Sequence, residues 1–109
     1  MNIDELTLKQ IKEIQNMGAS VPKSHPFKVG ENYFIRTVTM IICGRLESVG
    51  DSELVMSSAS WIADTGRFHD ALKTGKLNEV EPFINDVIIG RGSLIDATIW
   101  THSLPLSQK

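Results

Sequence analysis

The residues best suited to bind a ligand in this 109-residue chain are arginines that stand close to aromatic side chains. Arg67 directly precedes Phe68, and both follow Thr65 and Gly66 at the expected start of a short helix. A guanidinium group suits phosphate, a ring can stack on a base, and amides at a helix start attract anions. This pattern predicts nucleotide pockets at subunit boundaries, with arginines on phosphates and aromatic rings on bases. The expected ligand-binding residues are Arg36, Arg45, Trp61, Thr65, Gly66, Arg67, Phe68, Arg91 and Trp100. The same residue types also occur as core aromatics and salt-bridged arginines, and that alternative stays open.

No catalytic motif accompanies these residues. His25, His69 and His102 are far apart and show no metal-ligand spacing. The sequence holds no nucleophile elbow or phosphate-binding P-loop, and Gly90-x-Gly92 is not followed by a predicted helix. We therefore expect no metal, no cofactor and no enzymatic activity, although a hydrolase with a site assembled across subunits is an open alternative.

Composition narrows the class of protein further. The chain is 41% hydrophobic and 22% charged, with a formal net charge of -2 and no cluster of Lys or Arg. A generic nucleic-acid binder usually carries a basic footprint, although a local patch could form in a ring. No run of apolar residues is long enough to span a membrane, and the N-terminus lacks a signal-peptide pattern. The single Cys43 lies in an apolar run, which predicts a small buried side chain. We expect a cytoplasmic protein, in the host cell if it is viral, without membrane contact.

Two helices are expected around a set of strands. Thr7 and Gln10 form a capping box for an amphipathic helix that ends near Gly18, so residues 1–18 and 19–109 are read as a helix and a small β domain. A second helix over 67–74, capped by Asp64 and Thr65 and closed by Gly75, forms an insertion at about 65–75.

The strand pattern begins after a turn at residues 30–32. Residues 33–49 are rich in β-branched and aromatic types but long for one strand, so a bulge or bend is expected at Gly44. A second strand is predicted over 53–62, a loop over 78–85, and a closing hairpin from 87–89 to 94–100, followed by a frayed tail. Short strands and one small core predict a mainly β (α+β) fold, closed or nearly closed into a barrel.

Two stretches resemble the Sm/Hfq-like family. The segment Gly44-Arg45-Leu46 with Val49 and Asp51 is similar to the first Sm motif, and residues 89–95, Ile-Gly-Arg-Gly-Ser-Leu-Ile, are similar to the second. The resemblance implies a bent Sm/SH3-like barrel that forms rings by pairing strands between subunits. An additional Gly50, the absence of Asn after Asp51 and the inserted helix depart from that pattern.

A second resemblance covers residues 25–109. The stretch 61–68, Trp-Ile-Ala-Asp-Thr-Gly-Arg-Phe, and the downstream 78–83, Asn-Glu-Val-Glu-Pro-Phe, resemble a family of short uncharacterised bacteriophage and prophage proteins. This resemblance implies a viral accessory role, including the countering of host defence, but no defined activity.

Together these observations predict a non-catalytic homo-oligomer that binds or sequesters a small nucleotide-type ligand, such as a host defence signalling nucleotide. An Sm-like RNA-binding ring is one alternative. A protein-interaction module that inhibits or docks on a host or virion protein is another.

Overall fold

The computed structural model describes residues 25–109 of the chain. The helix expected over residues 7–17 lies outside this part, as does the proposed boundary at residue 18.

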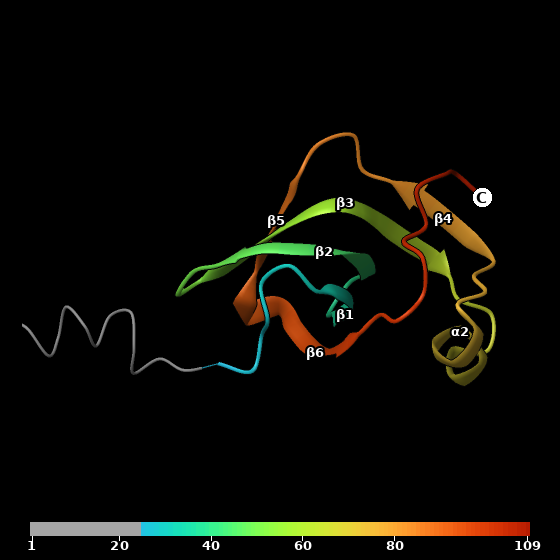
Figure 1. Ribbon diagram of the computed structural model, residues 1–109, viewed down its shortest axis with the longest axis horizontal. Coiled ribbons are helices and arrows are strands. Elements are labelled where there is room, and N and C mark those ends of the chain that lie inside the picture. Colours follow the sequence, from blue (N-terminus) through green and yellow to red (C-terminus); the bar gives the residue numbers. More distant parts are fainter. Residues whose placement is uncertain (1–24) are drawn as a thin grey trace, which may run out of the picture.

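The described chain is mainly β, as the sequence predicts. Six antiparallel strands form one sheet in the order β4-β3-β2-β1-β6, and β5 pairs with β3 beside this path (Figure 1). The strands are β1 (Asn32–Thr37), β2 (Ile41–Val49), β3 (Glu53–Asp64), β4 (Glu79–Pro82), β5 (Val87–Gly90) and β6 (Leu94–Ile99). Within the described residues no pairing joins β6 to β4 or β5, so the sheet is not closed by strand pairing.

The long β-branched run at 33–49 consists of two strands rather than one. Thr37 makes the turn between them, because its backbone N–H and its hydroxyl both donate to the Met40 carbonyl. The same hydroxyl accepts from the Met40 N–H at 3.0 Å. A threonine hydroxyl can thus complete a turn without Gly or Pro, and this turn was not predicted. The predicted turn before β1 is confirmed, with Gly30 at φ 93°.

β3 serves as two strands end to end. Its first half pairs with β5 and its second half with β4. Between the halves the β2–β3 register shifts near Gly44, and Ser58 adopts a left-handed φ of 47°. A Cβ on Gly44 would lie 2.8 Å from the Cβ of Ala59, so the close approach of these strands requires glycine. The irregularity expected at Gly44 is present, but the extra residue lies on β3, between Ser57 and Ser60, and not on the strand of Gly44.

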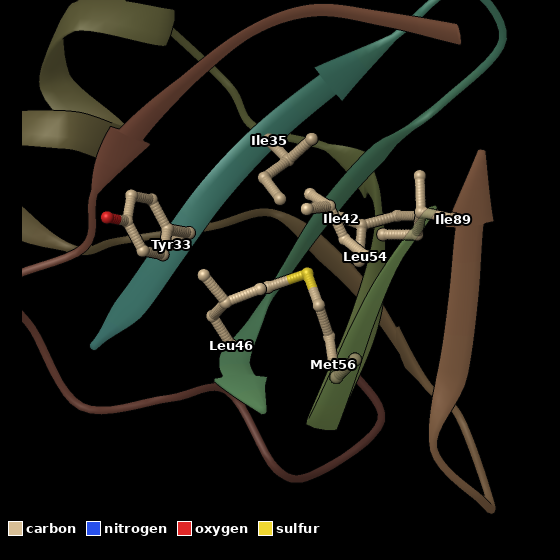
Figure 2. Packing of buried hydrophobic residues seen from close by; sticks show 8 residues of the cluster. Tyr33, Ile35, Ile42, Leu46, Leu54, Met56 and Ile89 are labelled. Atoms are coloured by element: carbon tan, nitrogen blue, oxygen red, sulfur yellow. The ribbon is translucent and has the colours of Figure 1, made fainter. Parts of the chain in front are cut away.

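Two separate apolar clusters hold the sheet. The first joins β1, β2, β3 and β5, and Figure 2 shows its side chains converging between the strands. The second packs α2 (Phe68–Thr74) and the C-terminal segment against the sheet. Its members are Phe34, Cys43, Ile62, Ala71, Leu77, Val80 and Trp100. Cys43 is fully buried as predicted, and burial raises the pKa of its thiol to about 12.

The inserted helix is present, but its start differs from the prediction. Arg67, without a side-chain cap, precedes α2, while the Asp64 carboxylate accepts from the Gly66 N–H. Asp64 instead ends β3, because the strand runs two residues beyond its predicted end. Gly75 ends the helix at φ 78° as predicted.

The C-terminal part departs most from expectation. The predicted loop contains β4, and the predicted hairpin is two strands that pair with different neighbours and are joined by a 3₁₀ turn (Arg91–Ser93). The tail is docked rather than frayed: Lys109 and Val80 exchange two backbone hydrogen bonds, and Ser60 donates its hydroxyl to the Pro105 carbonyl at 2.6 Å. These contacts depend on residues far apart in sequence, which local patterns do not reveal.

Candidate functional site

A polar depression lies beside α2. Figure 1 shows this helix at the lower right. The volume of the depression is about 410 Å³. We call it the α2 depression, and its lining residues are Thr65, Gly66, Arg67, Asp70, Thr74, Lys76 and Asn78.

The fold builds this depression from one helix face and two loops. Arg67, Asp70 and Thr74 are three and four residues apart, a spacing that places them on one side of α2. The loops on either side of the helix are tied together, because the Asn78 N–H donates to the Asp64 carbonyl at 2.9 Å. The Thr74 hydroxyl accepts from the Lys76 N–H and donates to the Asp70 carbonyl.

The charges in the α2 depression are unbalanced. It is lined by two cations, Arg67 and Lys76, and one anion, Asp70. Within residues 25–109 neither cation forms an ion pair or a side-chain hydrogen bond. Both side chains are exposed.

Arg36 and Phe68 form a separate contact nearby. The Arg36 guanidinium lies 4.9 Å from the centre of the Phe68 ring and is bridged to the Asp96 carboxylate. Hydrogen bonding from Arg36 lowers the pKa of Asp96. This contact joins β1, β6 and α2, and it occupies the guanidinium that the sequence assigned to a ligand.

The remaining predicted residues belong neither to the α2 depression nor to the contact between Arg36 and Phe68. Arg45 lies 3.5 Å from the Glu47 carboxylate, and Arg91 donates to the Gly50 carbonyl. Trp61 is half-exposed on β3, opposite Ile42 and Glu81. Within one copy of the chain, Arg45, Trp61 and Arg91 therefore lie apart from the α2 depression.

Trp100 belongs to the core. It is 3% exposed, stacks on Phe34, and contacts the edge of His102. Its indole N–H donates to the Ser103 carbonyl at 3.0 Å. A ring packed in this way presents no open face to a ligand, so the assignment of Trp100 to a binding surface is corrected.

A second, apolar region lies beside β5. We call it the β5 groove; its volume is about 270 Å³. Its lining comes from the β1–β2 turn, the end of β4 and the edge strand, and consists of Thr37, Thr39, Met40, Ile42, Phe83, Val87, Ile88, Ile89, Gly90 and Ser93. Ile88 is 72% exposed. This surface can take part in protein contact.

Two sheet edges are open among the described strands. β5 has β3 on one side and β6 has β1 on one side, with no second strand beside either. β6 also presents exposed isoleucines, Ile95 at 60% and Ile99 at 40%. The edge of β4 differs, because the tail covers it through Val80 and Lys109.

Sequence reasoning missed Asp70, Thr74, Lys76 and Asn78. The first two lie in α2 and the other two follow it, and the Asn78–Asp64 hydrogen bond holds the segment after the helix beside Thr65 and Arg67. A polar run after a helix end is common, so its composition carried no signal for a site. Over residues 25–109 no group of His, Cys, Asp and Glu is placed to hold a metal ion. In that same part of the chain no helix is long and apolar enough to cross a membrane.

Comparison with protein-family models, with curated proteins and with solved structures gave no match.

Proposed function

We propose that this protein is a non-catalytic binding protein that joins with copies of itself through its sheet edges and holds a small nucleotide-type ligand. The observation that carries the proposal is the pair of open edges, β5 with the exposed Ile88 and β6 with the exposed Ile95 and Ile99. Open edges can hydrogen-bond to another strand, and monomeric proteins usually blunt them with Lys, Pro or a covering segment.

The edge of β5 lacks such protection. Its sequence is Val-Ile-Ile-Gly, without charge or proline, and it borders the β5 groove. Pairing β5 of one copy with β6 of the next would bring Ile88 close to Ile95 or Ile99. A head-to-tail contact of this kind forms a ring when the rotation from each copy to the next adds up to a full turn.

We also propose that the six-stranded sheet curves into a bent barrel. The three-strand meander, the 3₁₀ turn before β6 and the return of β6 to β1 support a small Sm/SH3-like bent barrel. The resemblance to short bacteriophage proteins makes sequestration of a host defence signalling nucleotide in the host cytoplasm one concrete version. Sequestration needs affinity and slow release rather than acid–base groups.

Native mass spectrometry of the full chain, purified directly from its host, tests this function. We expect a defined oligomer with an intact small anionic ligand that is released on denaturation. A monomer without ligand at all concentrations would refute the proposal. Release of a cleaved nucleotide would instead support the hydrolase alternative.

The β5 groove favours one further candidate, a protein-interaction module for a host or virion protein. An extended peptide could add to β5 as a strand and place apolar side chains in the groove. This candidate predicts a complex with one copy of the chain and one of another protein. An Sm-like RNA ring would instead show affinity that falls steeply with salt.

A further inference from the structure

We infer that the α2 depression is the site of an anionic phosphate group, held by Arg67 from one side and Lys76 from the other. The inference deepens the proposed function and rests on it for the nucleotide class of the ligand. It assigns a ligand-binding role to Lys76 and Asn78, which the sequence analysis did not place among the ligand-binding residues.

The shape of the depression supports a small ligand. Its volume of about 410 Å³ falls in the usual range for small-molecule sites, roughly 300–1,000 Å³. Apart from Gly66, every residue that lines it has a polar or charged side chain, whereas most residues that line the β5 groove are apolar. Such walls suit a phosphate, whereas a base would need an apolar or aromatic face.

The two loops hold the polar groups near one another. Asn78 is anchored through its backbone to Asp64, and its side-chain amide lies against Gly66. A Cβ on Gly66 would be 3.0 Å from the Asn78 side-chain nitrogen, and the φ of 69° there also favours glycine. Gly66 therefore lets the amide of Asn78 stand beside the loop that carries Arg67.

The charges fit a phosphate. Arg67 can donate two parallel hydrogen bonds to phosphate oxygens, and Lys76 adds a point charge. Asp70, on the same wall, opposes an anion and so limits affinity in the free protein. Removing this carboxylate should tighten phosphate binding. If the affinity depended only on the net charge of the surface, charge changes inside and outside the depression would alter it equally.

The test is a titration of the ¹⁵N-labelled full chain with inorganic phosphate at constant pH and ionic strength, followed by amide chemical shifts. We expect saturable shifts at Gly66, Lys76 and Asn78, with none at Ile88. R67Q and K76Q should each weaken binding by about three- to fivefold, and D70N should tighten it by a similar factor.

K73Q is the matched control, because Lys73 lies on the same helix but outside the depression. Its affinity for phosphate should equal that of the unmodified chain. Equal weakening by K73Q and K76Q, or shifts that do not saturate, would overturn the site. A second titration with adenosine monophosphate separates the sources of the phosphate: tighter binding than inorganic phosphate indicates a nucleotide, and equal affinity indicates free phosphate.

The outcome is independent of assembly. Phosphate binding at Gly66 in a chain that stays monomeric would remove the proposed oligomer and leave the site. An oligomer whose Gly66 and Asn78 signals do not respond to phosphate would remove the site and leave the oligomer.

Discussion

The α2 depression begins directly after the end of β3, and the β5 groove borders the strand that pairs with the first half of β3, yet the two regions differ in charge and polarity. The depression is lined by charged and polar groups that local hydrogen bonds hold in place. The groove is mostly apolar and borders an open strand edge. Between the two regions β3 changes its partner from β5 to β4, near the left-handed Ser58 and the register shift opposite Gly44. One strand can thus support two unlike surfaces when its partners change halfway along its length.

The largest expected effect is the loss of self-association when a charge is placed on the edge of β5. In I88K a lysine replaces an exposed isoleucine on the edge of β5, so pairing with another copy should be lost. Size-exclusion chromatography with light scattering should show a monomer, while phosphate binding at the depression is unchanged. I84K is the control, because Ile84 is 94% exposed but lies in the loop between β4 and β5. An I88K protein that keeps the size of the unmodified chain would contradict edge pairing.

The next prediction concerns the close approach of β2 and β3 at Gly44, between the two regions. In G44A the new methyl group meets Ala59 at 2.8 Å, and the crowding should lower the free energy of unfolding by about 1–3 kcal/mol. Urea denaturation measures this change. G92A is the same substitution where nothing lies within 4 Å, and its stability should stay within about 0.5 kcal/mol of the unmodified chain. Equal free energies of unfolding for G44A and G92A would mean that the close approach of Gly44 to Ala59 does not require glycine.

A smaller effect is expected at the α2 end. S60A removes the buried hydroxyl that donates to the Pro105 carbonyl, and the loss should cost about 1 kcal/mol. Hydrogen exchange should then speed up at Lys109 and Val80, where the tail pairs with β4, while β5 is unaffected. S107A serves as the control, since Ser107 is an exposed residue of the same tail. Equally faster exchange in β5 would show that the stability of the β5 region depends on the docking of the tail.

The smallest effect concerns Asp96, which connects β6 to Arg36 and, through it, to Phe68. Arg36 lowers the pKa of this carboxyl, so its contribution to stability is present above the ordinary carboxyl pKa and is lost as pH falls through the lowered value. In R36Q the pKa of Asp96 should rise toward its ordinary value, as measured by carbon-13 NMR titration. An unchanged pKa of Asp96 in R36Q would contradict the bridge.

The sequence by itself determined those features that depend on neighbouring residues. The β-branched runs predicted a mainly β chain, Gly75 marked the helix end, and Gly44 marked an irregularity in the strand pairing. The apolar surroundings of Cys43 predicted its burial. These features follow from backbone preferences and local hydrophobic pattern, which do not depend on the rest of the fold.

Only the tertiary structure decided which distant segments meet. It put Trp100 in the core, gave Arg36 to Asp96, paired β5 and β6 with different strands, and docked the tail on β4. It also brought Lys76 and Asn78 to Arg67, so that the candidate site differs from the predicted set of residues. The physical reason is that an arginine or an aromatic ring has the same local pattern whether its partner is a ligand, a carboxylate or a core, and the partner is chosen by long-range pairing.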